Sequence, residues 1–62
     1  MFVKIFRIYF SSGREIVTKA DDYETFTHGN NFMEGILRKD HRIIARLNLD
    51  HVECIEEVIE YE

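Results

Sequence analysis

The chain has 62 residues, 45% of them hydrophobic and 32% charged, and a formal net charge of −4. This length allows a single domain, residues 1–62, and the composition is too apolar for a disordered chain and too charged for a membrane span. The only cysteine is Cys54, so an internal disulfide is excluded and a reducing cytoplasm is the expected location. Small domains bury little surface and often gain stability by self-association.

Charge changes sign from segment to segment along the chain. Residues 1–20 carry +3, residues 21–34 carry −4, residues 35–46 carry +3 and residues 47–62 carry −6. The last block is therefore the most acidic part of the chain, and it follows directly on a basic one. Opposite blocks can neutralise each other within one copy or between two copies.

The first twenty residues have the pattern of a β-hairpin. Residues 2–10, FVKIFRIYF, are rich in β-branched and aromatic types, and residues 14–20 form a second such run. The loop Ser11-Ser12-Gly13 suits a hairpin in which the glycine takes a positive φ. Both faces of the first strand carry apolar side chains, which predicts a second covering surface, such as another copy of the chain. The expected cross-strand pairs are Phe10 with Arg14, Ile8 with Ile16, and Phe6 with Thr18.

A short helix is predicted over residues 31–39. Asn31 and Glu34 have the spacing of a capping box, although with Asn in place of Ser or Thr. Gly35 weakens such a helix by about 1 kcal/mol relative to alanine. Residues 21–28, before it, are expected to form one or two helical turns. The apolar stripe that supports the longer helix consists of Phe32, Met33, Ile36 and Leu37.

The last twenty residues predict a second hairpin. Residues 42–49, RIIARLNL, alternate as in a strand with one buried face. Residues 51–61 fit a helix by their spacing and a strand by their β-branched content, and we take them as a strand that pairs back through a turn at Asp50-His51. The predicted fold is thus α+β, of ββαββ type, with one short helix between two hairpins. The expected core consists of Phe6, Ile8, Phe10, Ile16, Phe32, Ile36, Leu37, Ile43, Leu47 and Ile55.

No residue set in the sequence amounts to a catalytic or metal site, so we expect a non-enzyme without cofactors. Ser11 and Ser12 flank a turn glycine, and turn chemistry accounts for both of them. His51 and Cys54 are three residues apart, which is half of a zinc site, but the other histidines have no matching spacing. The sequence also lacks a phosphate-binding loop and a dinucleotide fingerprint.

The N-terminal hairpin combines basic and aromatic residues, as single-strand nucleic-acid platforms do. The sequence pI of about 5.3 counts against this function, because nucleic-acid-binding domains tend to be basic. Cations that converge on an exposed Tyr9 would favour it, whereas cations paired with carboxylates would count against it. It is the alternative function, and its candidate site is Lys4, Arg7, Tyr9, Arg14 and Lys19.

The final segment carries a row of carboxylates, Glu53, Glu56, Glu57 and Glu60. Such a row is in most cases a solvated strand face that prevents edge pairing. It also resembles the charge of a phosphate backbone, and can dock on the basic groove of a partner with the help of electrostatic steering. These four glutamates are therefore the candidate partner-binding site.

The segment RLNLDHVECIEEV, residues 46–58, resembles the ending of many small proteins of phages and mobile elements in Gram-positive bacteria. The N-terminal hairpin with its serine–glycine turn is similar too, whereas residues 21–31 depart from the pattern. The resemblance implies a ββαββ arrangement and a phage-type origin, with the host-cell cytoplasm as location. Together with the two-faced strand and the acidic row, it predicts a non-enzymatic regulator or inhibitor that acts by protein–protein interaction, as a homodimer and on a host protein. The matching residues are Leu47, Asn48, Leu49, Asp50, Val52, Ile55, Glu56 and Glu57.

Overall fold

The computed structural model describes residues 1–29 and 32–62, which form β-strands and one short 3-10 helix. In chain order these are β1 (Phe2–Phe10), β2 (Glu15–Ala20), β3 (Asp22–His28), β4 (Phe32–Lys39), β5 (Arg42–Asn48), η1 (Leu49–His51) and β6 (Val52–Tyr61). No α-helix occurs in these two ranges, so the predicted α+β fold is wrong and the protein is an all-β structure.

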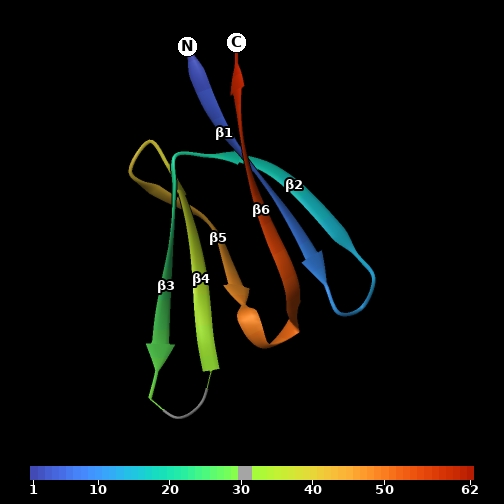
Figure 1. Ribbon diagram of the computed structural model, residues 1–62. Coiled ribbons are helices and arrows are strands. Elements are labelled where there is room, and N and C mark those ends of the chain that lie inside the picture. Colours follow the sequence, from blue (N-terminus) through green and yellow to red (C-terminus); the bar gives the residue numbers. More distant parts are fainter. Residues whose placement is uncertain (30–31) are drawn as a thin grey trace.

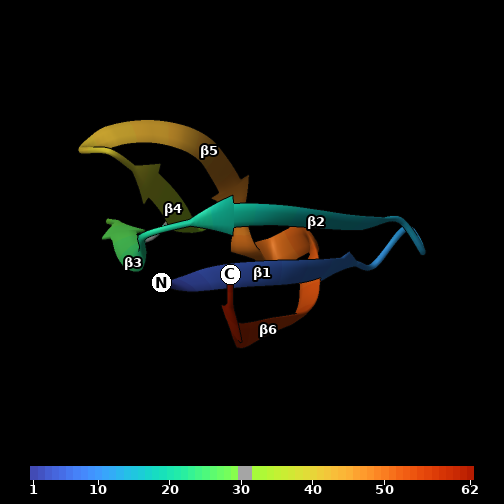
Figure 2. The ribbon, with the colours of Figure 1, turned by 90° about the horizontal axis from the view of Figure 1, so that it is seen from above.

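The strands form two three-stranded antiparallel sheets, β2-β1-β6 and β3-β4-β5. The chain leaves the first sheet at Asp21, between β2 and β3, and returns to it through η1, between β5 and β6 (Figure 1). Seen from above, β5 is strongly curved (Figure 2). Both sheets contribute to one hydrophobic core, whose buried members are Phe6, Ile8, Ala20, Leu37 and Leu47.

The N-terminal hairpin forms as the sequence predicts. Ile8 is paired with Ile16 and Phe6 with Thr18 in the β1–β2 ladder. Gly13 has a φ of 92°, a conformation that glycine adopts without steric cost. Its N–H donates to the carbonyl of Phe10 at 2.9 Å, which closes the loop. The turn residues therefore determine the register of this hairpin.

The predicted helix over residues 31–39 is wrong, because this segment is the central strand of the second sheet. Of its predicted capping box, Asn31 lies outside the described residues. Leu37 is fully buried in the core, while Ile36 is buried at 6% exposure on the opposite face, because consecutive residues of a strand point to opposite faces. The apolar residues of β4 therefore have helical spacing because this strand buries side chains on both of its faces. Residues 21–28, predicted as helical turns, contain the whole of β3, which pairs with β4 from Phe32 to Arg38.

The last segment is a strand, as predicted, but its predicted partner is wrong. β6 pairs with β1 and not with β5, so the C-terminal hairpin does not form. The predicted turn at Asp50-His51 is part of η1, where Asp50 N–H donates to the side chain of Asn48 at 3.0 Å. Pairing with β1 places Ile55 opposite the buried Ile8 and packs it against the core. Hydrophobic burial thus favours the distant strand over the neighbouring one.

Most of the predicted core residues are buried or packed against the core, and three are not. Phe32 is half-buried, and its ring is stacked on that of His28. Ile16 is 46% exposed, since it lies on β2, an edge strand of its sheet. Ile43 is 45% exposed, because the β4–β5 ladder shifts register at Arg38 and interrupts the alternation of β5. Partly buried residues that the sequence did not single out include Tyr23, Ala45, Leu49 and Val52.

Among the described residues, no helix has the length and apolar character needed to cross a membrane.

Candidate interaction surfaces

The sheet β2-β1-β6 has a second apolar face, turned away from the core. Because side chains alternate along β1, Val3 and Ile5 lie opposite to Phe6 and Ile8. Val58 is the direct partner of Ile5 on β6, and Val17 lies diagonally across on β2. Val17 is 53% exposed and Val58 is 43% exposed. We call the set Val3, Ile5, Val17 and Val58 the outer apolar cluster.

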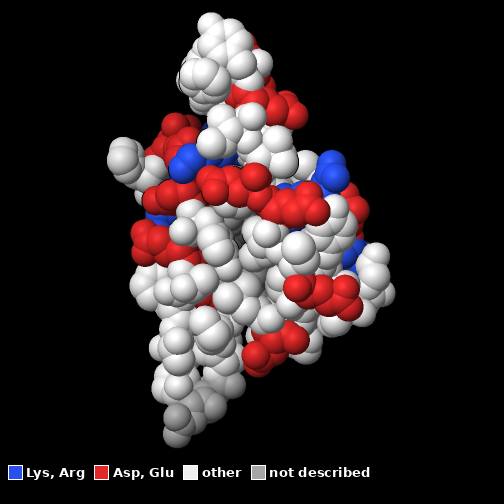
Figure 3. Space-filling model, viewed as in Figure 1, with Lys and Arg blue, Asp and Glu red and all other residues white. Residues whose placement is uncertain are grey.

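The predicted acidic row is divided between the two faces of β6. Glu56 and Glu60 lie on the outer face, beside the outer apolar cluster, because they are the partners of Arg7 and Val3. Glu57 is paired with Phe6 and therefore points the other way. Glu53 has no direct partner, since the β1–β6 ladder shifts register at this point. Carboxylates are nevertheless prominent on the side of the molecule that bears β6 (Figure 3).

Three of the four cations in the predicted nucleic-acid site, Lys4, Arg7 and Lys19, are paired with carboxylates. Lys4 Nζ lies 3.6 Å from Glu57 Oε1, and Arg7 Nε lies 3.4 Å from Glu15 Oε1. Lys19 forms an ion pair with Glu62. Tyr9 is half-buried, and Arg14 lies exposed in the hairpin loop. Arg7 also interacts with Tyr9, which raises the pKa of Arg7. Because Tyr9 is half-buried and Lys4 and Lys19 are engaged with carboxylates, the arrangement counts against a stacking platform for single strands.

The outer face of the other sheet is closed by ion pairs. Ile36 is buried there, with Glu24 and Arg46 as its cross-strand partners. Arg38 Nη1 lies 2.7 Å from Glu24 Oε1, and Arg46 Nη1 lies 3.9 Å from Glu34 Oε1. These charged side chains cover the isoleucine with their aliphatic stems. This cover depends on long-range strand pairing, which explains why the sequence alone did not reveal it.

Among the described residues the edge strands are β2 and β6 in one sheet and β3 and β5 in the other, and β5 and β6 carry opposite charge. Within the described part of the chain, β5 pairs with β4 alone and β6 pairs with β1 alone. β5 contains Arg42 and Arg46 and no acidic residue. β6 contains the four glutamates of the acidic row and no basic residue. Unpaired backbone groups along such edges can accept a further strand.

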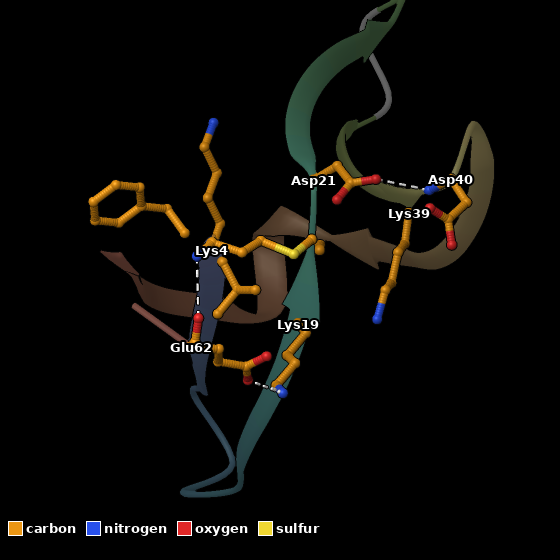
Figure 4. Close-up of a pocket in the computed structure, with 10 residues that line it drawn as sticks. Lys4, Lys19, Asp21, Lys39, Asp40 and Glu62 are labelled. Carbon is orange, nitrogen blue, oxygen red and sulfur yellow. Dashed lines mark hydrogen bonds and ion pairs between the residues drawn. The ribbon is translucent and has the colours of Figure 1, made fainter. Parts of the chain in front are cut away.

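A pocket of about 350 Å³ lies between the two ends of the chain and the β4–β5 turn. Figure 4 shows Lys19 and Glu62 in contact on one side of it, with Asp21, Lys39 and Asp40 across from them. The ion pair raises the pKa of Lys19 and lowers the pKa of Glu62. Asp21 Oδ2 accepts a hydrogen bond from Asp40 N–H at 2.7 Å. The charged side chains that line the pocket are three lysines and three carboxylates, so neither charge is in excess to select a ligand.

Of the residues considered for catalysis, Ser11 has a structural role. Ser11 Oγ donates to the backbone carbonyl of His51 at 3.3 Å, and Ser11 N–H donates to the same oxygen at 2.9 Å. This serine therefore ties the first hairpin to η1. In residues 1–29 and 32–62, no three His, Cys, Asp or Glu side chains come together as a metal site.

No protein-family model, no curated protein and no solved structure matches the chain, so its function must be argued from its surfaces.

Proposed function

We propose that the protein is a small non-enzymatic regulator or inhibitor, of phage type, that associates with itself and binds a host protein. The observation that carries this proposal is the outer apolar cluster. Its sheet buries Phe6, Ile8 and Ala20 on the face turned to the core, so Val17 and Val58, exposed on the other face, do not serve the core of a single copy. Apolar side chains grouped on a surface and surrounded by charges are typical of protein interaction sites.

The charges around the cluster indicate which chemistry the host protein presents. Glu56 and Glu60 lie on the β6 side of the cluster, while Arg7 and Lys19 are engaged with Glu15 and Glu62. A complementary partner therefore has an apolar centre with basic residues facing β6. Charges at the rim contribute more to the rate of association and to specificity than to affinity.

Affinity capture from the lysate of a Gram-positive host tests the binding surface. The variant Val17→Asp places a charge in the outer apolar cluster, on the strand that lies farthest from β6. We expect it to lose the host protein that the unaltered chain retains. Met33→Asp is the matched control, because Met33 is 45% exposed on the other sheet and its variant should retain the same protein.

Circular dichroism should show that both variants are folded before their capture is compared. Retention of the host protein by Val17→Asp at the unaltered level would contradict this binding surface.

A further inference from the structure

The strands β5 and β6 follow each other in the chain, with only η1 between them, yet they belong to different sheets. Each of them ends its sheet with an open edge. The side chains along these two edges match, as a hairpin would require, but the structure does not form that hairpin. The matching edges are therefore available to another molecule.

The match is clearest in one antiparallel alignment. Ile44 then lies opposite Val58, Arg46 opposite Glu56 and Leu47 opposite Ile55. These are two apolar pairs and one pair of opposite charge, the combinations that stabilise neighbouring strands. The same alignment places Arg42 opposite Glu60. In the single chain Ile44 is 44% exposed and Val58 is 43% exposed, so both gain burial from the contact.

Charge selects this combination over the alternatives. Pairing β6 with a second β6 would place glutamates close to glutamates, and pairing β5 with a second β5 would bring arginines together. Like charges on neighbouring strands are destabilising. Of these three contacts between β5 and β6 edges, only the mixed one joins a basic edge to an acidic one. The side chain of Arg46 is 64% exposed beside Glu34 and is free to turn toward a second acidic partner.

We propose that the protein assembles head to tail, with β5 of one copy added in antiparallel fashion to β6 of a second copy. This inference rests on the proposed self-association and specifies which two strands make the contact between copies. Val58, Glu56 and Glu60 also belong to the surface proposed for the host protein, so a copy whose β6 edge is occupied keeps Val3, Ile5 and Val17 of the outer apolar cluster for that protein. Because the contact joins two different surfaces, it repeats from copy to copy until the assembly closes.

A charge-exchange experiment tests the contact in the full chain. One variant, Arg42→Glu with Arg46→Glu, makes both edges acidic. The other, Glu56→Lys with Glu60→Lys, makes both edges basic. In sedimentation, each variant alone should associate about tenfold more weakly or worse, because attraction becomes repulsion at both charged positions. An equimolar mixture should associate again, because the acidic edges then meet basic ones. Arg14→Glu, in the hairpin loop, is the control and should associate as the unaltered chain does.

The outcomes separate this contact from the more general proposal. A monomer at high micromolar concentration for the unaltered chain overturns both the contact and the self-association. Variants that associate normally, or a mixture that remains monomeric, overturn the edge contact and leave self-association standing. Salt gives a second measurement that needs no variant: association that fails to weaken between about 0.05 and about 0.5 M salt overturns the charged contact.

Discussion

Gly35 lies against the ring of Tyr23, and a Cβ at this glycine would stand 2.9 Å from Tyr23 Cε1. The same Cβ would stand 3.0 Å from Leu49 Cδ2. The missing side chain thus leaves room for a tyrosine of β3 to cross β4 and reach the core, where its ring centroid lies 6.1 Å from that of Phe6. Burial of this ring raises the pKa of Tyr23. A glycine in the middle of β4 therefore supports packing between the two sheets.

The first prediction concerns this close approach. Gly35→Ala should lower the free energy of unfolding by about 1–3 kcal/mol, because the added methyl group must displace the tyrosine ring or Leu49. Urea denaturation measures the loss. Thr25→Ala is the matched control, since Thr25 is exposed directly opposite Gly35 on β3 and its loss should cost about 0.5 kcal/mol or less. Equal stability of Gly35→Ala and the unaltered chain would contradict the packing role of the glycine.

Sequence reasoning succeeded where a local signal determines the structure. The loop glycine determined the register of the first hairpin, alternation indicated β5, and β-branched residues indicated β6. It failed for β4, whose apolar residues occur at helical spacing because Leu37 and Ile36 are buried on opposite faces. Gly35 was the local signal against that helix, because glycine is unfavourable in a helix interior. In the strand, the missing side chain makes room for Tyr23.

The candidate surfaces depend on pairings between distant parts of the chain, and local patterns do not determine those. Alternation along β6 correctly separates Glu56 from Glu57. The pairing of β6 with β1 decides which of them meets Lys4 and which lies beside the outer apolar cluster. That pairing forms because it adds Ile55 to the core, an advantage that becomes visible only once the two sheets are packed.

The second prediction compares two apolar residues that the sequence placed together in the core. Leu37→Ala should cost about 2–5 kcal/mol, because Leu37 is fully buried and leaves a cavity. Ile43→Ala should cost about 1 kcal/mol or less, because half of the Ile43 side chain already faces solvent. Thermal and urea unfolding measure both values. Similar losses for the two variants would contradict the register shift that takes Ile43 out of the core.

The third prediction concerns the two-residue turn between β4 and β5. Asp40 has a φ of 54° and His41 a φ of 65°, a left-handed pair typical of tight hairpin turns. Asp40 is held in place by the side chain of Asp21, whereas His41 has a strained backbone without such support. His41→Gly should therefore raise the free energy of unfolding by about 1 kcal/mol. His41→Ala is the control and should give no such gain, because alanine keeps the strain.

The fourth prediction concerns the pH dependence of the pair formed by Lys19 and Glu62. The pKa of Glu62 is lowered from its ordinary 4.5, first by the hydrogen bond from Lys19 and then by the charge of that ammonium group. A lowered carboxyl pKa stabilises the folded state above pH 4.5, and this contribution is lost as the pH falls through the lowered value. The pKa of Lys19 is raised above 10.5, so its contribution is complete below that pH and is lost as the pH rises through the raised value.

Both side chains are exposed, so the effect on stability is small and is weakened by salt. The pKa itself is the sharper quantity. In an NMR titration of the Glu62 side-chain carboxyl group, Lys19→Met should return the pKa of that group toward 4.5. Lys39→Met is the control and should move it less, because Lys39 acts on Glu62 by charge alone and more weakly than Lys19. An unchanged Glu62 pKa in Lys19→Met would mean that the pair does not hold the end of β6 against β2 in solution.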